Sequence, residues 1–350
     1  MQDNNGKKPL IQVEDLKVSF FTPAGEVKAV GGISYHLYNG DVMGIVGESG
    51  SGKSVEAYSI MGLLQSPGKV IGGKILFDGD DILEYSADRM EDLRGNRVSM
   101  IFQNPMTSLN PVYTIGNQLM EAVLTHQNIS KDEAYKKAVN ILEMVGINNA
   151  EKRMKQYPHE FSGGMRQRVM IAMGLICEPE LLIADEPTTA LDVTIQAQII
   201  ELMKDLQSKT GMAIIFITHN LGVVAEICNK VSVMYAGEII EFGPVDDIFY
   251  NPKHPYTMGL LRSMPRVDAD SYERLIPIEG TPVDMLEPPK GCRFAPRCEH
   301  CMDVCLNYSP EYTDIGPDHK AACWMLQKDD ILQGKKPLVR YESTGGNDGE

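Results

Sequence analysis

Eight consecutive residues, 47–54, have the types and the spacing needed to hold phosphate groups. They read GESGSGKS and fit the pattern G-x-x-x-x-G-K-[ST], between a predicted strand and a predicted helix that begins near Lys53. Glycines let backbone N–H groups converge on phosphate oxygens, and the helix points its positive end at the same place. Lys53 would neutralise the β- and γ-phosphates, and Ser54 would offer its hydroxyl to Mg²⁺. The predicted nucleotide-binding residues are Gly47, Glu48, Ser49, Gly50, Ser51, Gly52, Lys53 and Ser54.

Two carboxylates follow a second apolar run. The segment LLIA at 181–184 reads as a buried strand, and Asp185 and Glu186 come directly after it. A strand tip can present Asp185 to Mg²⁺, directly or through water, and Glu186 then lies where it can polarise an attacking water. An ordinary exposed strand end is the alternative, but the pairing with a phosphate-binding loop favours hydrolysis of a bound triphosphate.

A third motif, FSGGMRQR at 161–168, places two adjacent glycines at the start of a predicted helix. Glycine is costly there unless the backbone must approach something closely. Ser162, two bare amides and a helix N-terminus form an anion site. An N-cap followed by a glycine hinge is the alternative interpretation. A second phosphate site in a chain with one phosphate-binding loop makes sense if it completes that loop on another subunit.

The composition is ordinary for a soluble globular protein. The 350 residues are 43% hydrophobic and 23% charged, which fits two domains or one large domain with an appendage. The net charge of −15 disfavours general nucleic-acid binding. No uninterrupted apolar run approaches the roughly 20 residues that span a bilayer, and the N-terminus lacks an apolar signal core. We expect an intracellular chain whose membrane role comes through a partner.

Predicted strands alternate with predicted helices, which indicates an α/β protein with a parallel sheet. Strand patterns cover 10–21, 98–102, 181–184 and 212–217, and an amphipathic helix covers 195–206. Residues from about 105 to 179 show helical spacing and read as a helical insertion. Prolines become dense after about residue 250, which marks a boundary to a smaller, loop-rich module.

The three motifs belong to a set of six that resembles the ATP-binding cassette of ABC transporters. The resemblance covers roughly residues 10–250. It implies a P-loop ABC ATPase core of the α/β class, with an antiparallel β subdomain and a helical insertion. The motifs are Walker A at 47–54, the Q-loop at 102–103, a variant LSGGQ signature at 161–165, Walker B at 181–186, the D-loop at 190–192 and the H-loop at 218–219.

By this resemblance, two cassettes stack head to tail and sandwich two ATP molecules. Gln103 would reach Mg²⁺ and the attacking water, and His219 would contact the γ-phosphate and hold Glu186 in place. Phe20, or its neighbour Phe21, would stack on adenine. The implied residues are Glu186, His219 and Gln103 for catalysis; Ser54, Gln103 and Asp185 for Mg²⁺; and Ser162, Gly163, Gly164 and Met165 for the partner's ATP.

The resemblance narrows to the ATPases of oligopeptide and dipeptide importers. It rests on YPHEFSGGMRQRVMIA at 157–172, on NPKHPY at 251–256, which is similar to this family's C-terminal HPY region, and on Met165, typical of D-type subunits. The implied partners are a sister F-type ATPase, two transmembrane permease subunits and an extracytoplasmic substrate-binding protein acting through the permease. The implied location is peripheral, on the cytoplasmic face of the cell membrane.

Three other functions stay open at this point. A nickel or other small-solute importer would use the same type of ATPase. A soluble cassette protein acting on nucleic acid or ribosomes is disfavoured by the single cassette and the acidic balance. A nucleotide-dependent metal sensor is the third.

The chain is predicted to divide into three parts. These are a nucleotide-binding domain at 1–250, a Cys-rich C-terminal module at 251–335 and a disordered tail at 336–350.

Five of the seven cysteines lie close together near the C-terminus, which suggests metal ligation in a reducing cytosol. The family resemblance implies a [4Fe-4S] cluster, for which four thiolates suit in number and softness. Structural zinc is one alternative, with Cys301, His300 and His319 as further candidate ligands, and unligated thiols are the other. We expect Cys177 and Cys228 to be buried small apolar residues. The predicted cluster ligands are Cys292, Cys298, Cys305 and Cys323.

Overall fold

The computed structural model describes residues 8–104, 108–188, 191–264 and 277–327. The start of the helical insertion near residue 105, Ala190 of the D-loop, and the tail predicted at 336–350 lie outside the described residues. Within the described ranges, no helix is both long enough and apolar enough to cross a membrane.

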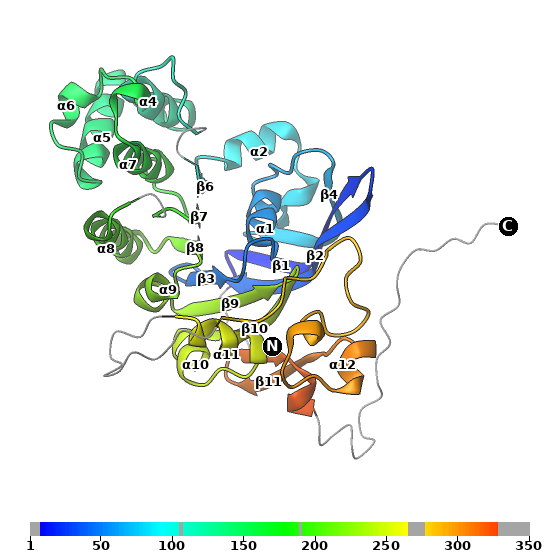
Figure 1. The fold of residues 1–350 in the computed structure, drawn as a ribbon. Helices are drawn as coiled ribbons and strands as arrows, with labels where there is room; N and C mark the ends of the chain where they lie inside the picture. Colours follow the sequence, from blue (N-terminus) through cyan, green and yellow to red (C-terminus); the bar gives the residue numbers. More distant parts are fainter. Residues whose placement is uncertain (1–7, 105–107, 189–190, 265–276, 328–350) are drawn as a thin grey trace, which may run out of the picture.

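The core is an eight-stranded sheet (Figure 1). Its strands lie in the order β11-β12-β10-β9-β3-β8-β7-β6. The pairs from β9 to β6 are parallel, which confirms the predicted parallel sheet, whereas the pairs from β9 to β11 are antiparallel. The strands are β3 Val42–Val46, β6 Val98–Ile101, β7 Leu181–Asp185, β8 Ala213–Ile217, β9 Lys230–Tyr235, β10 Glu238–Pro244, β11 Tyr312–Gly316 and β12 His319–Ala322.

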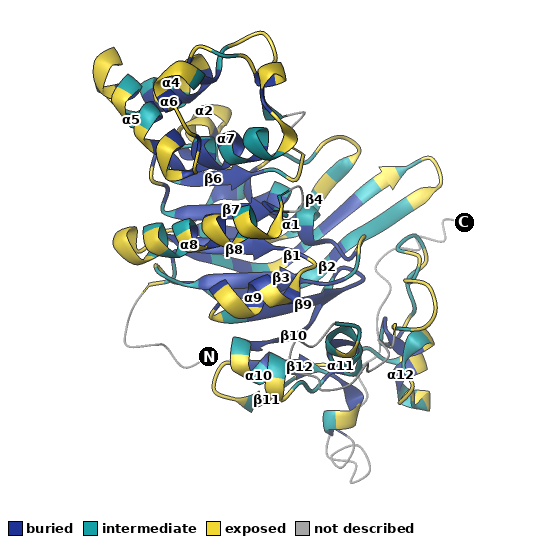
Figure 2. Ribbon diagram, turned by 60° about the vertical axis from the view of Figure 1, so that its left-hand side comes forward, coloured by how far each residue is buried: buried dark blue, intermediate teal, exposed yellow. Residues whose placement is uncertain are grey.

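Both faces of the parallel part of this sheet are buried, because successive side chains enter two different apolar clusters. Leu182 and Ala184 of β7 pack with the helical side of the molecule, and Leu181 and Ile183 pack with the other side. Figure 2 shows the dark, fully buried strands behind α8 and α9, which carry their exposed residues outward. These helices are α8 Val193–Thr210 and α9 Leu221–Ile227.

The second face of the core is covered by helix α1, Lys53–Ile60, and by a separate antiparallel sheet in the order β2-β1-β4-β5. This confirms the predicted antiparallel β subdomain and the helix that begins at Lys53. The strands are β1 Ile11–Thr22, β2 Gly25–Leu37, β4 Gly68–Phe77 and β5 Asp80–Asp81, followed by helix α2 Ala87–Leu93.

The described residues between β6 and β7 include four α-helices of the predicted helical insertion, which lies apart from the antiparallel sheet in Figure 1. Side-chain oxygens of Thr114, Ser130 and Ser162 cap three of them by accepting from backbone N–H groups of the first turn. Ser130 and Glu133 form a reciprocal capping box. The helices are α4 Ile115–His126, α5 Lys131–Met144, α6 Ala150–Arg153 and α7 Gly163–Leu175.

The region after residue 250 is joined to the core rather than set apart from it. Strand β12 pairs with β10, so that the C-terminal region supplies two strands to the main sheet. The buried carboxylate of Glu241 in β10 accepts from the backbone N–H groups of Lys253 and His254 at 2.7 and 2.9 Å. The predicted division near residue 250 is therefore not a division of the sheet. The helices here are α10 Val245–Tyr250, α11 Pro255–Arg262 and α12 Asp303–Asn307.

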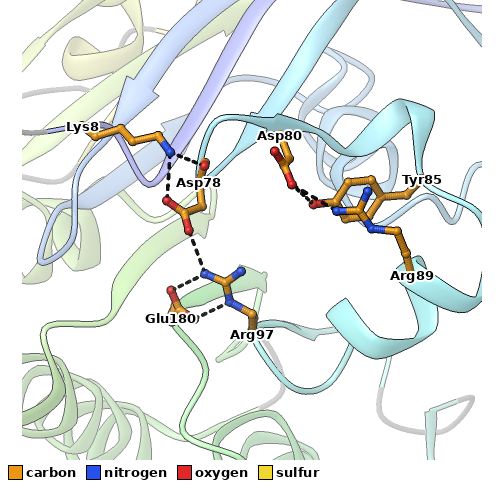
Figure 3. Close-up of polar contacts among 7 residues, drawn as sticks. All are labelled: Lys8, Asp78, Asp80, Tyr85, Arg89, Arg97 and Glu180. Carbon is orange, nitrogen blue, oxygen red and sulfur yellow. Dashed lines mark hydrogen bonds and ion pairs between the residues drawn. The ribbon is translucent and has the colours of Figure 1, made fainter.

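A surface network joins the antiparallel subdomain to the core (Figure 3). Arg97, between α2 and β6, makes a two-point ion pair with Glu180 before β7, with one contact of 3.0 Å. The same guanidinium reaches Asp78 at 3.4 Å, and Asp78 also binds Lys8 at 3.2 Å. Exposed pairs such as these contribute little stability individually, so the network chiefly fixes the geometry of the turn after β4.

Glu56 of α1 is a buried carboxyl group facing β2, and burial raises its pKa to about 7. Because the unfolded pKa is lower, the folded chain holds more protons between about pH 4.5 and 7, and stability falls as pH rises through this window. We expect Glu56→Gln to remove this fall, which amounts to about 3 kcal/mol. Urea unfolding at pH 5 and pH 7.5 measures it. Glu201→Gln, at an exposed position of α8, is the control, and equal pH dependence in wild type and Glu56→Gln would contradict the prediction.

Candidate active site

The loop at 47–54 runs from the end of β3 to the start of α1, and two of its glycines admit no side chain. Gly47 has a φ of +152°, and a Cβ there would lie 2.2 Å from the carbonyl oxygen of Met234. Gly52 has a φ of +101°, and a Cβ would lie 2.6 Å from the carbonyl oxygen of Ala29. The loop is therefore packed directly against the backbones of β9 and β2, which leave no space behind it.

The amine of Lys53 lies inside this loop. Its Nζ donates to the carbonyl oxygens of Gly47 and Glu48 at 2.8 and 2.9 Å. Burial lowers the pKa of Lys53, while the neighbouring carboxylates of Glu186 and Asp185 oppose that effect. Lys53 thus lies near the carboxylates of Glu186, Asp185 and Glu48.

Ser54 and Asp185 meet across the site. The Ser54 hydroxyl donates to Asp185 Oδ1 at 3.1 Å. The second oxygen, Oδ2, is buried and has no hydrogen-bond partner among the described residues, and burial raises the pKa of Asp185. A hydroxyl beside a buried carboxylate with one uncommitted oxygen is an oxygen-rich donor set that fits Mg²⁺.

Glu186, the residue after β7, is contacted by both other predicted catalytic side chains. Gln103 Nε2 donates to Glu186 Oε2 at 3.0 Å, and His219 Nδ1 lies 3.3 Å from Glu186 Oε1. Glu186 has a φ of +48°, a conformation that costs energy for a residue with a side chain. Its N–H donates to the carbonyl oxygen of Ile217 at the end of β8, so the backbone bond holds it in this conformation.

Ser162 and the two glycines after it form the N-terminus of α7. The Ser162 hydroxyl accepts from the N–H of Met165 at 3.4 Å. A Cβ on Gly163 would meet nothing within 4 Å, and one on Gly164 would meet only a Leu191 methyl group at 3.5 Å. Crowding within this chain therefore does not account for the glycine pair.

The remaining predicted residues are the ring that would stack on adenine and Asp192 of the D-loop. Phe20 of β1 packs on Gly68 of β4, whereas the side chain of Phe21 is 48% exposed. Stacking of Phe20 on adenine stays a prediction, and Phe21 is the more exposed alternative. Asp192 of the D-loop is the N-cap of α8 and accepts from Ile195 N–H at 3.0 Å.

Two residues that touch the loop were missed in the sequence. The Tyr256 hydroxyl, in the HPY stretch, accepts from the N–H of Glu48 at 2.9 Å. His254 of the same stretch is buried and caps α11. Arg297 forms a two-point ion pair with the Glu48 side chain. The only signal available was a pair of arginines in an otherwise Cys-rich segment.

The four predicted cluster ligands lie near one another. The charge of Cys305 affects the pKa of Cys292, Cys298 and Cys323, and Cys298 also affects Cys323. In the described part of the chain, no three His, Cys, Asp or Glu side chains are arranged to hold a metal ion.

His319, one of the further candidate ligands, lies beside two carboxylates in the fold. It is buried in β12, its Nε2 lies 3.0 Å from Glu241 Oε1, and its Nδ1 lies 4.0 Å from Asp247. Pairing with a buried carboxylate explains the histidine without a metal. Cys177 and Cys228 are buried as predicted, and Cys301 is exposed.

Comparison with known proteins decides the family. Residues 30–189 match the family model of ABC transporters, and residues 240–305 match that of the oligopeptide/dipeptide transporter C-terminal region. The chain is 54% identical over 321 residues to the oligopeptide transport ATP-binding protein OppD of Bacillus subtilis, covering 91% of this chain and 90% of that one. The chain belongs to the ATP-binding proteins of the oligopeptide/dipeptide ABC transporter family.

Other members of this family give the same result. The chain is 54% identical to the dipeptide transport ATP-binding protein DppD of Bacillus subtilis, over 90% of this chain and 94% of the relative. It is 53% identical to OppD of Escherichia coli, over 90% of this chain and 93% of the relative. As a member of this ABC family, the chain is an ATPase.

Solved structures agree on the fold. A dimeric ATP-binding cassette in a post-hydrolysis state with ADP and Pi superposes with a TM-score of 0.62 at 24% identity, covering 67% of this chain and 98% of that one. The CbiO1 protein of Clostridium perfringens superposes with a TM-score of 0.58 at 29% identity, covering 70% of this chain and 92% of that one. The two solved structures cover 67% and 70% of this chain, so about a third of the chain has no counterpart in them.

Proposed function

We propose that this ATPase powers the uptake of oligopeptides or dipeptides through an ABC importer. The observation that carries the proposal is the identity of 54% to both OppD and DppD of Bacillus subtilis, over at least 90% of this chain in each case. The match includes the HPY region at 240–305, which lies beyond the cassette match at 30–189. The ATPase itself does not bind the transported solute, so peptide length is left to the other subunits.

In the proposed hydrolysis, each side chain of the site has one task. Lys53 neutralises the β- and γ-phosphates, while Ser54, Asp185 and Gln103 hold Mg²⁺ directly or through water. When bound, Mg²⁺ supplies electrostatic stabilisation of the charge on the phosphates. Glu186 accepts a hydrogen bond from the attacking water and orients it. The contact between His219 and Glu186 at 3.3 Å supports a task of His219 in holding that carboxylate.

The signature residues would serve the ATP of a second subunit. The uncrowded glycines at 163 and 164 leave the N-terminus of α7 open to close approach from outside the chain. A helix N-terminus with a serine hydroxyl and bare amides attracts phosphate. Met165, at the position where most cassettes have glutamine, supports a D-type subunit that pairs with a sister F-type ATPase.

The other proposed partners are two transmembrane permease subunits and a substrate-binding protein on the far side of the membrane. The chain would lie on the cytoplasmic face and act on the permeases through its helical insertion, α4–α7. Closure of the two cassettes on ATP and their reopening after hydrolysis would drive the permeases between their two open states.

A [4Fe-4S] cluster remains part of the proposal. Such a cluster distributes its thiolates over four iron atoms, so its ligands need not converge on one point as zinc ligands do. The mutual influence of Cys292, Cys298, Cys305 and Cys323 supports this arrangement, and the cluster would stabilise a segment with few apolar residues. Because burial raises the pKa of Cys292 to about 12, binding of the cluster would release a proton there.

Anaerobic purification tests the cluster. We expect iron and inorganic sulfide near four per chain, with the broad visible absorption of a cluster. Cys305→Ser, at a buried position, should abolish both, whereas Cys301→Ser, at an exposed position, should retain them. Zinc in place of iron, or equal loss in the two variants, would contradict the assignment.

The transport proposal is tested with the ATPase co-purified with its permeases and sister ATPase in lipid vesicles. ATP hydrolysis is measured with empty substrate-binding protein and with the same protein loaded with short peptides. We expect strong stimulation by peptide. Basal hydrolysis with no response to peptide, but with a response to nickel or another small solute, would overturn the peptide assignment and leave the ATPase assignment intact.

A further inference from the structure

Glu48, the second residue of the P-loop, is fixed by two side chains from the C-terminal region. Nη1 and Nη2 of Arg297 donate to Oε2 and Oε1 of Glu48 at 2.6 and 3.0 Å. The N–H of the same residue donates to the Tyr256 hydroxyl at 2.9 Å. Both the side chain and the backbone of Glu48 therefore depend on residues that lie 249 and 208 positions further along the chain.

Arg297 is itself held in one geometry. Its side chain is 3% exposed, whereas that of Glu48 is 28% exposed. The Arg297 Nε donates to the carbonyl oxygen of Glu279 at 2.9 Å, and Nη1 reaches the Tyr235 hydroxyl at 3.4 Å. A buried guanidinium that lost its carboxylate would be left unpaired at considerable cost, so the pair is a fixed contact.

An aromatic cluster supports the second contact. The rings of Tyr235, Tyr256 and Phe294 lie 4.8 to 5.3 Å apart, centroid to centroid. They come from β9, from α11 and from the Cys-rich segment, so three distant stretches of sequence meet behind the P-loop. Rings at these distances contribute packing beyond their buried area and limit the movement of the Tyr256 hydroxyl.

A displacement of Glu48 would also move the groups that bind phosphate. Its carbonyl oxygen accepts from Lys53 Nζ at 2.9 Å, so the backbone at 48 and the amine of Lys53 are coupled. Its carboxylate also carries a negative charge beside a loop that must accept a triphosphate. Without the guanidinium of Arg297, that charge would repel the ligand.

We propose that Arg297 is a positioning residue of the nucleotide site, which holds Glu48, cancels its charge and thereby lets the C-terminal region set the affinity of the P-loop for ATP. Arg297 acts through Glu48 and touches no reacting atom. It should therefore affect the KM for ATP far more than kcat, because hydrolysis uses Glu186 at the other side of the site.

The test compares ATPase kinetics of variants in the full chain. Arg297→Met removes the charge while keeping most of the length, and we expect the KM for ATP to rise about three- to tenfold with kcat within about twofold of wild type. Adding Glu48→Gln to Arg297→Met removes the unpaired carboxylate and should bring KM back toward the wild-type value. A merely structural role of Arg297 would not give this rescue.

Arg97→Met is the matched control, because Arg97 makes the same two-point pair with Glu180 away from the P-loop (Figure 3). It should leave KM unchanged. The proposal is overturned if Arg297→Met alters neither KM nor the Kd of a non-hydrolysable ATP analogue, if it acts no more strongly than Arg97→Met, or if Glu48→Gln does not reverse it. Should Arg297→Met fail to fold, Arg297→Gln is measured in the same way, and an unchanged KM together with an unchanged Kd of the analogue would overturn the proposal.

Discussion

Glu186→Gln is expected to lower kcat for ATP hydrolysis by about a hundredfold or more, because the amide cannot accept the proton of the attacking water. Glutamine has nearly the same size as glutamate, so the side chain at 186 can still contact Gln103 and His219, although without its negative charge. ATP binding should persist, and the variant should accumulate the closed dimer of the proposed mechanism. Single-turnover hydrolysis and ATP titration of the purified complex measure the two effects separately.

Glu178→Gln is the matched control for this variant. Glu178 also has a positive φ, +55°, but it lies before β7 and pairs with Lys137 on the surface. It should leave kcat unchanged. Turnover of Glu186→Gln at the wild-type rate would remove Glu186 from the catalytic role, even if ATP binding behaved as expected.

Lys53→Ala is expected to weaken ATP binding by about a hundredfold, which corresponds to roughly 3 kcal/mol. The amine lies within 3 Å of two P-loop carbonyl oxygens, at 2.8 and 2.9 Å, so it is already placed at the centre of the loop. Its removal leaves the carboxylates of Asp185 and Glu186 without their nearest cation. Calorimetric titration with Mg²⁺-ATP in the Glu186→Gln background measures the affinity without interference from hydrolysis.

Lys230→Ala provides the comparison. Lys230 is a largely buried lysine at the start of β9, and it pairs with Asp41 at 2.8 Å, away from the P-loop. It should reduce the free energy of unfolding but leave the ATP affinity close to wild type. Equal affinities of Lys53→Ala and wild type would contradict the phosphate role of Lys53.

The parts of the site that could be predicted from the sequence are those built from neighbouring residues. The P-loop lies between its strand and its helix within a dozen residues, Asp185 ends strand β7, and Glu186 follows it directly. In a parallel sheet the carboxyl ends of strands meet at one edge, which brings these groups together without further information. Alternation of apolar residues predicted the first strand, β1, whereas the antiparallel subdomain that contains it was implied by the family resemblance.

The contacts that could not be predicted join residues far apart in the sequence. No local sequence pattern indicates that Arg297 forms an ion pair with Glu48, because an arginine between cysteines has no preferred partner. The same holds for β12, which lies among prolines and turns and yet pairs with β10. His319 was a further candidate ligand for the zinc alternative because cysteines lie near it in the sequence, and the sequence could not show that the fold places it beside Glu241.

The contact between Glu48 and Arg297 also has a consequence for the newly made chain. The two residues are 249 positions apart in the chain. At a synthesis rate of about 5 to 20 residues per second, Arg297 is therefore added roughly 12 to 50 s after Glu48. During that interval the P-loop, its strand and its helix have left the ribosome without the guanidinium and the phenol that fix residue 48. The nascent cassette thus completes its nucleotide loop only after most of the chain has been translated.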